Sequence, residues 1–425
     1  MTVYQGATLI TVNGDFDVIE HGTLAVEGEK IVYAGPYKEF PGAAVQDCTG
    51  RVIIPGFVNG HCHMPMQFFR GYSDDMSLQV WLNERIFPLE DHHTPMTQYH
   101  GAQMAALEMI RTGTTTVNDM YLDGWQTARA LKEAGLSGIV CTCLMTLYPD
   151  REERLKSALE LAAEYKNDPL IRTSIGPHAE YTCDPKDLER WSQIAYDTNQ
   201  PIHIHCSETI TEHNESIGRN GLTPVGLFNR IGMLKNHTLL AHCVHVSEED
   251  MDIIKETGAS VLHNPCSNLK LASGFAPVPR MIEKGLNISL STDSASSNNT
   301  LDMWEEMRVF ALIHKGNTLD PLVINAKQAL YYATKGSALA LGYADRGSLE
   351  EGMRADFLVV SMDEPAMSIP TNPVNLVVYS GNSRDIVMTV AGGKVLYSSG
   401  CYTTLDRDKI VADCRQDFAT YFAGV

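Results

Sequence analysis

The sequence predicts an α/β fold, a (β/α)8 barrel of the TIM type beside a small β-sandwich domain built from both chain ends. Strand-like and helix-like stretches alternate between residues 56 and 345, and short strand-like runs dominate both ends. No Gly-rich phosphate turn follows the first barrel strand, which disfavours the competing doubly wound sheet. We therefore expect residues 1–55 to begin the β domain, residues 56–345 to form the barrel, and residues 346–425 to complete the β domain and add a terminal helix.

The N-terminal part consists of short strands separated by Gly, Asn and Asp residues, with no long helical period. The expected strands are Val3–Val12, Gly22–Glu27, Lys30–Ala34 and Val52–Ile54. The pattern changes after Pro55-Gly56, where the alternation of strands and helices begins.

The barrel part contains eight expected strands, and helical stretches lie between them. The strands are 57–63, 114–119, 138–145, 171–177, 201–206, 238–243, 259–263 and 287–292. The helical stretches include Met96–Thr112, Glu152–Lys166, Asp187–Thr198 and Glu248–Thr257. Eight repeats over roughly 290 residues fit a barrel, whose usual length is about 250 residues.

The C-terminal part is strand-like again. Ala355–Val360 and Ile386–Ala391 are expected strands, and a Gly392-Gly393 turn predicts a hairpin with Lys394–Tyr397. A last helix is expected over about 406–422. Its apolar stripe consists of Ile410, Cys414, Phe418 and Phe422, which we expect to dock on the rest of the protein.

Composition excludes several classes of protein. The 425 residues carry 33 Lys+Arg and 52 Asp+Glu, a net charge of −19, so a general nucleic-acid binder is disfavoured. No apolar run is long enough to span a membrane, and the N-terminus does not resemble a signal peptide. Ten cysteines without a CxxC pair are too few for a disulfide scaffold, so a reducing cytoplasm is expected. A small molecule is the expected partner, and a homo-oligomer is left open.

Histidines gather at the C-terminal ends of the expected barrel strands, where barrels of this type carry their catalytic groups. These ends contain His61, His63, His178, His203, His205, His242 and His245, and the last contains Asp293. His61 and His63 are two residues apart on one strand and so share a face. With His205 and Asp293 they form a ligand set suited to zinc or a similar divalent ion, with one position left for water.

Other histidines in the sequence are expected to be structural. His203 lies on the same face of its strand as His205 but deeper in the barrel, and we expect it to be a hydrogen-bonded core residue. The same interpretation applies to His92, His93, His100 and His213, which fall in helices or loops. The third and fourth strand ends, CTCLMTL and RTSIGPHAEY, contain no lysine that could bridge a second ion, so a single metal is expected.

Two further residues are candidates for proton transfer and for stabilising a tetrahedral centre. Glu208 follows His205 by three residues, where a carboxyl group can serve as general acid and base without binding the metal. His242 can form a hydrogen bond to the attacking water or to the developing oxygen.

The strings that carry these residues resemble the amidohydrolase superfamily, and most closely its 5'-methylthioadenosine/S-adenosylhomocysteine deaminases. They are PGFVNGHCH, WLNERIFPLE, GPHAEYTC, HIHCSET, LAHCVH, SVLHNPCSNLKLASGFAPV, STDSASSNN and GSLEEGMRADFLVV. The resemblance covers nearly the whole chain.

The resemblance implies metal ligation by His61, His63, His205 and Asp293, and substrate contacts by Glu90 and His178. An ionised Glu90 suits a sugar diol, because a carboxylate accepts from two hydroxyl groups. The chain departs from the pattern at one point. Cys143 stands roughly where an arginine is expected to pair the carboxylate of S-adenosylhomocysteine, and Arg154 lies a little further on.

The sequence thus predicts metal-dependent hydrolytic deamination of an adenosine-type nucleoside, with zinc the expected ion and Fe²⁺ or Mn²⁺ open. The metal would activate water, Asp293 would take its proton, Glu208 would protonate the ring nitrogen, and His242 would stabilise the tetrahedral oxygen. Another aromatic aminohydrolase, such as a guanine or pterin deaminase or a triazine hydrolase, is the alternative. A non-catalytic barrel is disfavoured because the ligand set is intact.

Overall fold

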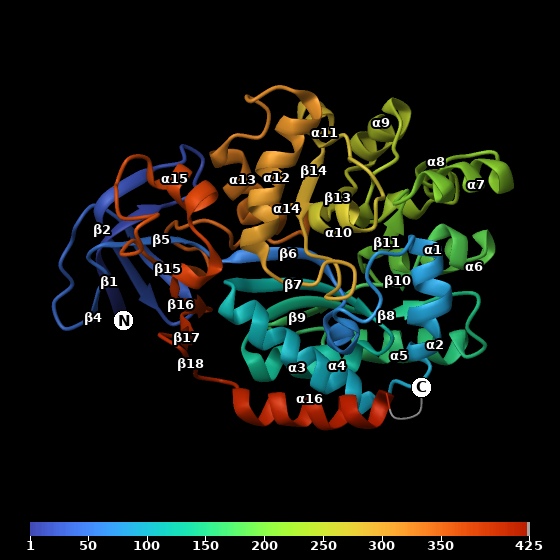
Figure 1. Ribbon diagram of the computed structural model, residues 1–425, viewed down its shortest axis with the longest axis horizontal. Helices are drawn as coiled ribbons and strands as arrows, with labels where there is room; N and C mark the ends of the chain where they lie inside the picture. The colour runs from blue at the N-terminus through green and yellow to red at the C-terminus, as the bar shows by residue number, and fades with distance from the viewer. Residues whose placement is uncertain (423–425) are drawn as a thin grey trace.

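A computed structural model describes residues 1–422 and shows two parts, a twisted sheet at one end of the molecule and a barrel at the other (Figure 1). The sheet has nine strands in the order β18-β17-β16-β15-β5-β1-β2-β3, with β4 pairing on β1. These strands are β1 (Thr2–Ile10), β2 (Val18–Glu27), β3 (Lys30–Gly35), β4 (Ala44–Asp47), β5 (Arg51–Pro55), β15 (Phe357–Ser361), β16 (Ile386–Ala391), β17 (Lys394–Ser398) and β18 (Cys401–Tyr402).

The two chain ends meet where β15 pairs antiparallel with β5, so that Phe357 lies opposite Pro55. Gly392 and Gly393 both have positive φ, at 54° and 72°, as a two-residue turn between twisted strands requires. The sheet encloses a core of its own, in which the rings of Tyr4 and Phe357 meet edge to face. The predicted fold class is confirmed, and the domain boundaries at 55/56 and 345/346 stay a prediction.

The barrel of the described chain has eight parallel strand positions, as the sequence predicts. Its strands are β6 (Phe57–Cys62), β7 (Thr114–Tyr121), β8 (Ser137–Leu144), β9 (Ile171–Thr173) with β10 (Gly176–Pro177), β11 (Ile202–Cys206), β12 (Thr238–His242), β13 (Ser260–His263) and β14 (Asn287–Leu290). Every residue of β7 and β8 is buried, because helices cover the outer face of a parallel sheet.

Two seams close the barrel. Isolated bridges between Ile175 and Ile202 and between Ala179 and His205 join the fourth strand to the fifth. The amide of Asp293 donates to the carbonyl of His61 at 2.9 Å and joins the eighth strand to the first. Gly60 is required at this second seam, since a Cβ there would lie 2.0 Å from Oγ of Ser289. Closure brings the ends of β6 and β14 together and so determines which side chains share the barrel mouth.

Helices surround the barrel. They are α3 (Pro95–Arg111), α4 (Gly124–Ala134), α5 (Arg151–Glu164), α6 (Pro185–Asp197), α7 (Ile210–Asn220), α8 (Pro224–Arg230), α9 (Glu248–Thr257), α10 (Pro265–Lys270), α11 (Val278–Lys284), α12 (Met303–Thr318), α13 (Ala326–Ala333) and α14 (Lys335–Ala340), with α15 (Pro373–Asn375) beside the end sheet. Four short 3-10 turns span Met64–Phe69, Glu180–Thr182, Met233–Lys235 and Ser383–Asp385, and a π turn spans Leu376–Ser380. Local sequence sets the helix ends. At α9, for example, Ser247 caps the first turn through the amide of Asp250, and Gly258 ends the helix at φ 74°.

A helical segment of the first βα connection extends over the pocket at the barrel mouth. It consists of α1 (Leu78–Trp81), a π turn over Leu82–Ile86 and α2 (Phe87–Glu90). A π turn closes its hydrogen bonds over five residues instead of four, and so changes which side chains face inward. Trp81, Leu82, Ile86, Phe87 and Glu90 all line the pocket described below.

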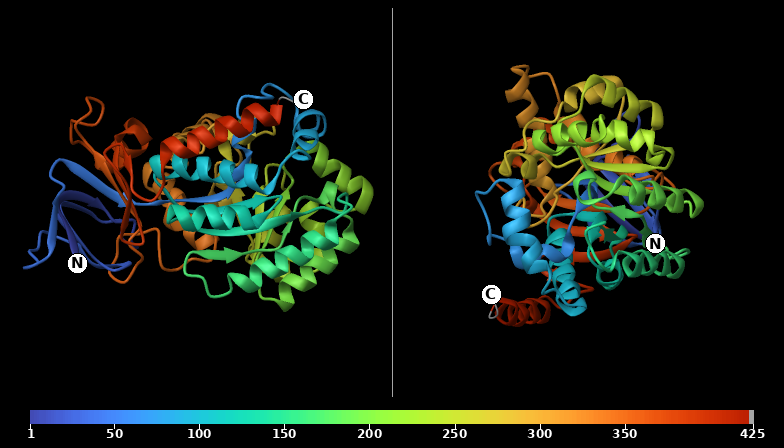
Figure 2. Two further views of the ribbon diagram at one scale, coloured as in Figure 1. Left: turned by 90° about the horizontal axis from the view of Figure 1, so that it is seen from below. Right: turned by 90° about the vertical axis from the view of Figure 1, so that its right-hand side faces the viewer.

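The terminal helix α16 (Arg407–Tyr421) runs along the outside of the barrel beside α3 (Figure 2). The docking of this helix agrees with the prediction, but the prediction that Phe418 belongs to its buried stripe is wrong. Ile410 and Cys414 are buried, whereas Phe418 is 48% exposed and Tyr421 is buried instead. Successive helix positions turn by about 100°. Relative to Ile410, Phe418 is therefore rotated around the helix by about 80°, whereas Tyr421 is rotated by only about 20°.

Candidate active site

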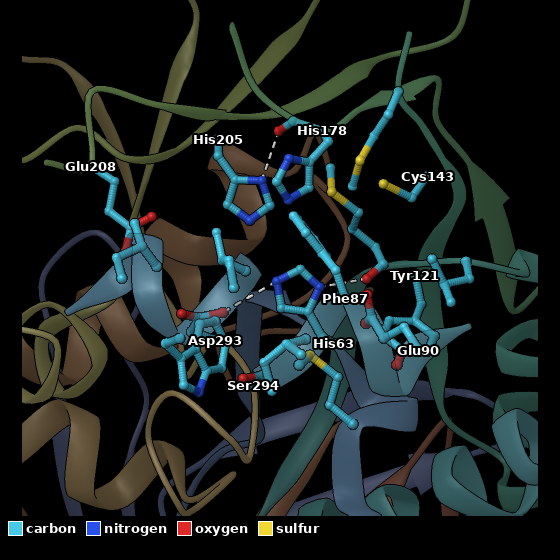
Figure 3. Close-up of a pocket in the computed structure, with 18 of the residues that line it drawn as sticks. His63, Phe87, Glu90, Tyr121, Cys143, His178, His205, Glu208, Asp293 and Ser294 are labelled. Atoms are coloured by element: carbon cyan, nitrogen blue, oxygen red, sulfur yellow. Dashed lines mark hydrogen bonds and ion pairs between the residues drawn. The ribbon is translucent and has the colours of Figure 1, made fainter. Parts of the chain in front are cut away.

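Four of the predicted residues converge at the barrel mouth. His61 and His63 come from the end of β6 and its following residue, His205 from β11, and Asp293 from the segment after β14. One ligand atom from each of the three histidines lies within 4.8 Å of the others. Oδ1 of Asp293 is 3.5 Å from Nε2 of His61 and 3.2 Å from Nε2 of His63. Figure 3 shows His63, His205 and Asp293 pointing into the pocket.

The other ring nitrogen of each histidine already has a partner. Nδ1 of His63 lies 2.6 Å from the carbonyl of Met120, and Nδ1 of His205 lies 2.7 Å from that of His178. A carbonyl only accepts, so both Nδ1 atoms donate and both Nε2 atoms present a lone pair. Nδ1 of His61 lies 2.7 Å from Nε2 of His203.

This arrangement fits a divalent metal ion. Nε2 of His61 is buried and has no hydrogen-bond partner among the described residues. Oδ2 of Asp293 accepts from Oγ of Ser267 at 2.6 Å, which leaves Oδ1 facing the histidines. Three imidazole nitrogens and one carboxylate oxygen form a donor set that suits zinc.

Glu208 and His242 lie beside this cluster. Oε2 of Glu208 is 3.7 Å from Nε2 of His242, and Oε1 accepts from Oγ of Ser273 at 3.4 Å. Burial raises the pKa of Glu208 above its ordinary value, although the nearby His242 acts in the opposite sense. Its carboxyl group can therefore carry a proton at a higher pH than an exposed glutamate can.

Either neutral tautomer of the His242 ring can form a hydrogen bond at Nδ1. Its Nδ1 lies 2.8 Å from Oδ1 of Asn268 and 3.2 Å from Nδ2 of Asn264. It can therefore donate to Asn268 or accept from Asn264. In the second form the proton is on Nε2, which lies toward Glu208 and the pocket.

One pocket joins this cluster to the expected substrate contacts. Its lining includes Glu90, His178 and Cys143 as well as Glu208 and Asp293. In Figure 3, Glu208 and Asp293 lie on one side of the pocket and Glu90 and Cys143 on the other. The structure thus brings the predicted site residues together, with His61 buried at the base, whereas their individual roles stay predictions.

The substrate candidates have perturbed acidities. Burial raises the pKa of Glu90 to about 7, and the neighbouring Tyr121 acts in the opposite sense. Burial lowers the pKa of His178 to about 3, so its ring is neutral near pH 7. Nδ1 of His178 lies 3.0 Å from Oγ1 of Thr182, which orients Nε2 away from that contact.

Comparison with known proteins agrees with this geometry. A model of the amidohydrolase family matches residues 52–396.

The chain belongs to the amidohydrolase family.

The family prediction made from the sequence is thereby confirmed, and curated relatives agree with it. A protein of Syntrophomonas wolfei named 5-methylthioadenosine/S-adenosylhomocysteine deaminase is 39% identical over 96% of each chain. One of the same name from Moorella thermoacetica is 40% identical, also over 96% of each chain.

Solved structures agree in fold. An adenosine deaminase from Xanthomonas campestris with bound zinc matches with a TM-score of 0.96 and 30% identity, covering 100% of this chain and 99% of that one. A zinc complex of the atrazine chlorohydrolase of Arthrobacter aurescens matches with a TM-score of 0.90 and 23% identity, over 98% of this chain and 100% of that one. The second likeness concerns the fold alone.

Several residues of this amidohydrolase site were not assigned a role from the sequence. Asn264, Ser267 and Asn268 hold His242 and Asp293, and they follow β13 in the NPCSN string. That position, directly after a barrel strand, is the signal that could have identified them. His203 is a buried core residue as expected, and it also holds the ring of His61.

Glu212 is another residue of the site without a role assigned from the sequence. Thr209-x-x-Glu212 matches the capping-box pattern. This pattern predicts that the glutamate carboxylate accepts a hydrogen bond from the amide of Thr209. The carboxylate instead accepts from the amides of Ser207 and Glu208, at 2.9 and 2.7 Å. Glu212 therefore holds the backbone from which Glu208 projects.

Proposed function

We propose that this chain is a metal-dependent deaminase that hydrolyses the exocyclic amino group of an adenosine-type nucleoside, giving the inosine analogue and ammonia. The observation that carries the proposal is the convergence of three histidines and Asp293 with the Glu208–His242 pair at one pocket. The names of the curated relatives and of the zinc-bound adenosine deaminase support this substrate class.

The proposed metal ligands are His61, His63, His205 and Asp293, and zinc is the expected ion, one per chain. The zinc-bound solved structures support that choice of ion. A bound divalent ion supplies Lewis-acid activation of water at neutral pH.

The side chains of the protein carry the protons. In the proposed reaction, the oxygen of the attacking water bonds to C6 of the purine while Asp293 accepts a proton from that water. Glu208 delivers a proton to the adjacent ring nitrogen, so that the ring can take up the electron pair. With Asn264 donating to Nδ1, Nε2–H of His242 donates to the developing oxygen. Asp293 then passes its proton to the amino nitrogen, the C6–N bond breaks and ammonia leaves. The hydroxyl group at C6 gives its proton to Glu208, which leaves the 6-oxo purine and restores both side chains.

Glu90 and His178 are the proposed substrate contacts. Glu90 lies across the pocket from Glu208 and, when ionised, accepts from the two ribose hydroxyl groups. Neutral His178 lies beside His205, with ring centroids 4.7 Å apart, and so faces the part of the nucleoside nearest the metal.

Ammonia release measured against a panel of purine nucleosides, free purine bases and pterins tests the proposal. We expect turnover of adenosine-type nucleosides. Turnover of guanine or a pterin without any adenosine would favour the alternative aminohydrolase.

Two broader predictions accompany this function. Among residues 1–422, no helix combines the length and the apolar character that a bilayer crossing requires. We propose a cytoplasmic location, which is supported by ten cysteines that are all free. The acidic charge supports a small-molecule substrate and no nucleic-acid partner. Whether the chain forms a homo-oligomer stays open to measurement.

A further inference from the structure

Part of the pocket is lined by apolar side chains. Its walls include Trp81, Ile86 and Phe87 from the helical segment over the mouth, and Met120, Cys143 and Met145 from the strands beneath. Met120, Cys143 and Met145 are each at most 3% exposed and belong to one packed cluster. Thioether and aromatic groups form favourable contacts with alkyl and thioether groups. Among the residues of this wall, only the indole N–H of Trp81 and the weak thiol donor of Cys143 can donate a hydrogen bond, and none carries a positive charge.

Apart from the histidines, the charged side chains that line the pocket are all acidic. Its carboxylates are Glu90, Glu208 and Asp293, and none of the lining residues in the described chain is Lys or Arg. A ligand that brought a carboxylate here would therefore lose water without gaining a cationic partner. It would also face repulsion from Glu90 once that group is ionised.

Arg154 is the nearest candidate for the missing cation, and it is engaged elsewhere. Its Nε lies 3.0 Å from Oδ1 of Asp150, and its guanidinium donates to the carbonyl of Leu122 at 3.2 Å and covers the ring of Tyr148 at 4.2 Å. It lines a neighbouring cavity that shares only Glu90 and Leu122 with the active-site pocket. To reach a ligand at Cys143, Arg154 would have to give up these three contacts.

We propose that this site selects nucleosides with a neutral, apolar 5' substituent and rejects those that carry a carboxylate there. Cys143 is the specificity-determining residue, because it occupies the wall where a cation is needed. This inference rests on the proposed deaminase function. It predicts that 5'-methylthioadenosine and 5'-deoxyadenosine are better substrates than S-adenosylhomocysteine, although the curated relatives are named for both kinds of substrate.

A matched pair of substrates tests charge without changing size. Adenosine 5'-carboxamide and adenosine 5'-carboxylate differ by one charge, and 5'-methylthioadenosine serves as the apolar reference. We expect kcat/KM to be highest for 5'-methylthioadenosine, and at least about 10-fold higher for the carboxamide than for the carboxylate, the effect of one missing charge-assisted pair. Equal or faster turnover of the carboxylate would overturn the proposal.

Two variants locate the effect. Cys143→Arg should lower the ratio of kcat/KM for the carboxamide to kcat/KM for the carboxylate. Cys143→Met, a neutral control of intermediate length, should leave this ratio unchanged. If the wild-type protein accepts the carboxylate and Arg154→Ala loses that activity, Arg154 supplies the cation and the proposal is wrong. Failure of the proposed function looks different, because no adenosine of the panel would then release ammonia.

Discussion

Nε2 of His242 lies 3.7 Å from Oε2 of Glu208, and both side chains are at least nine-tenths buried. The two groups come from different strand ends, β12 and the turn after β11. Their proximity places a proton carrier and a hydrogen-bond donor on the same side of the pocket. Each can act on a different atom of one substrate carbon–nitrogen unit.

Glu208→Gln tests the proton transfer. The amide keeps the size of the side chain but cannot carry the proton, so kcat should fall by at least about 10²-fold while bound metal is retained. Glu215→Gln is the control, because Glu215 lies on the following helix α7 and pairs with Arg219 at the surface. Turnover of Glu208→Gln at the wild-type rate would contradict the assigned role.

His205→Ala tests the metal ligands. Loss of one of four ligands should abolish both the bound ion and activity, and elemental analysis of the wild type should give about one divalent ion per chain. His237→Ala is a suitable control, since this half-buried histidine contacts the carbonyl of Ala340 just before β12, at the opposite end of that strand from His242. Two tightly held ions per chain would disprove the single-metal prediction.

Glu212→Gln tests the support of Glu208. The carboxylate of Glu212 accepts from the backbone amides of Ser207 and Glu208. In the variant, the side-chain NH2 group would face one of these two donors and could not accept its hydrogen bond. We expect kcat to fall by about 10-fold, with KM and metal content close to wild type.

Asp250→Asn supplies a matched control for Glu212. Asp250 accepts from the amide of Ser247 at the start of α9, so this variant alters a similar helix cap outside the pocket lining. Both variants should lose roughly 0.5–2 kcal/mol of stability. An equal loss of kcat in the two would show that Glu212 acts only through general stability.

Glu306→Gln tests a pH effect on stability. Burial raises the pKa of Glu306 to about 8, and its carboxyl group accepts from the amide of Cys266 at 3.2 Å. Between its ordinary value and about pH 8 the folded state therefore binds more protons than the unfolded state, so the free energy of unfolding decreases as pH rises.

The expected decrease from this residue is on the order of 5 kcal/mol, and Glu306→Gln should remove it. Urea unfolding between about pH 5 and pH 9 measures the effect. The exposed neighbour Glu305 provides Glu305→Gln as a control, which should keep the wild-type slope. An unchanged slope in Glu306→Gln would contradict the raised pKa.

Much of the site could be predicted because its information is local. His61-Cys62-His63 and His203-Ile204-His205 lie at strand ends, and parallel strands of a barrel bring their ends to one rim. The alternation of strands and helices therefore fixed both the fold class and the position of the proposed ligands. No contact between distant residues had to be known.

The terminal helix shows where local patterns fail. The stripe was read at a spacing of four residues, which drifts around the helix. Phe418 is therefore exposed, whereas Tyr421 is buried against the rings of Phe68, Phe69 and His93. At Thr209 only one of the two capping-box contacts forms, since the hydroxyl of Thr209 accepts from the amide of Glu212. Glu212 turned to the amides of Ser207 and Glu208, because the strand end leaves those donors buried beside it.

The sequence by itself determined the order of the elements, the strand-end histidines and the acidic charge, since each depends on neighbouring residues or on composition. Tertiary structure alone decided that Asn264 and Asn268 pair with His242, that Arg154 is held by Asp150 and Leu122, and that no cation lines the pocket of the described chain. These features depend on how the closed barrel places loops that are distant in sequence, and a linear pattern does not encode those distances.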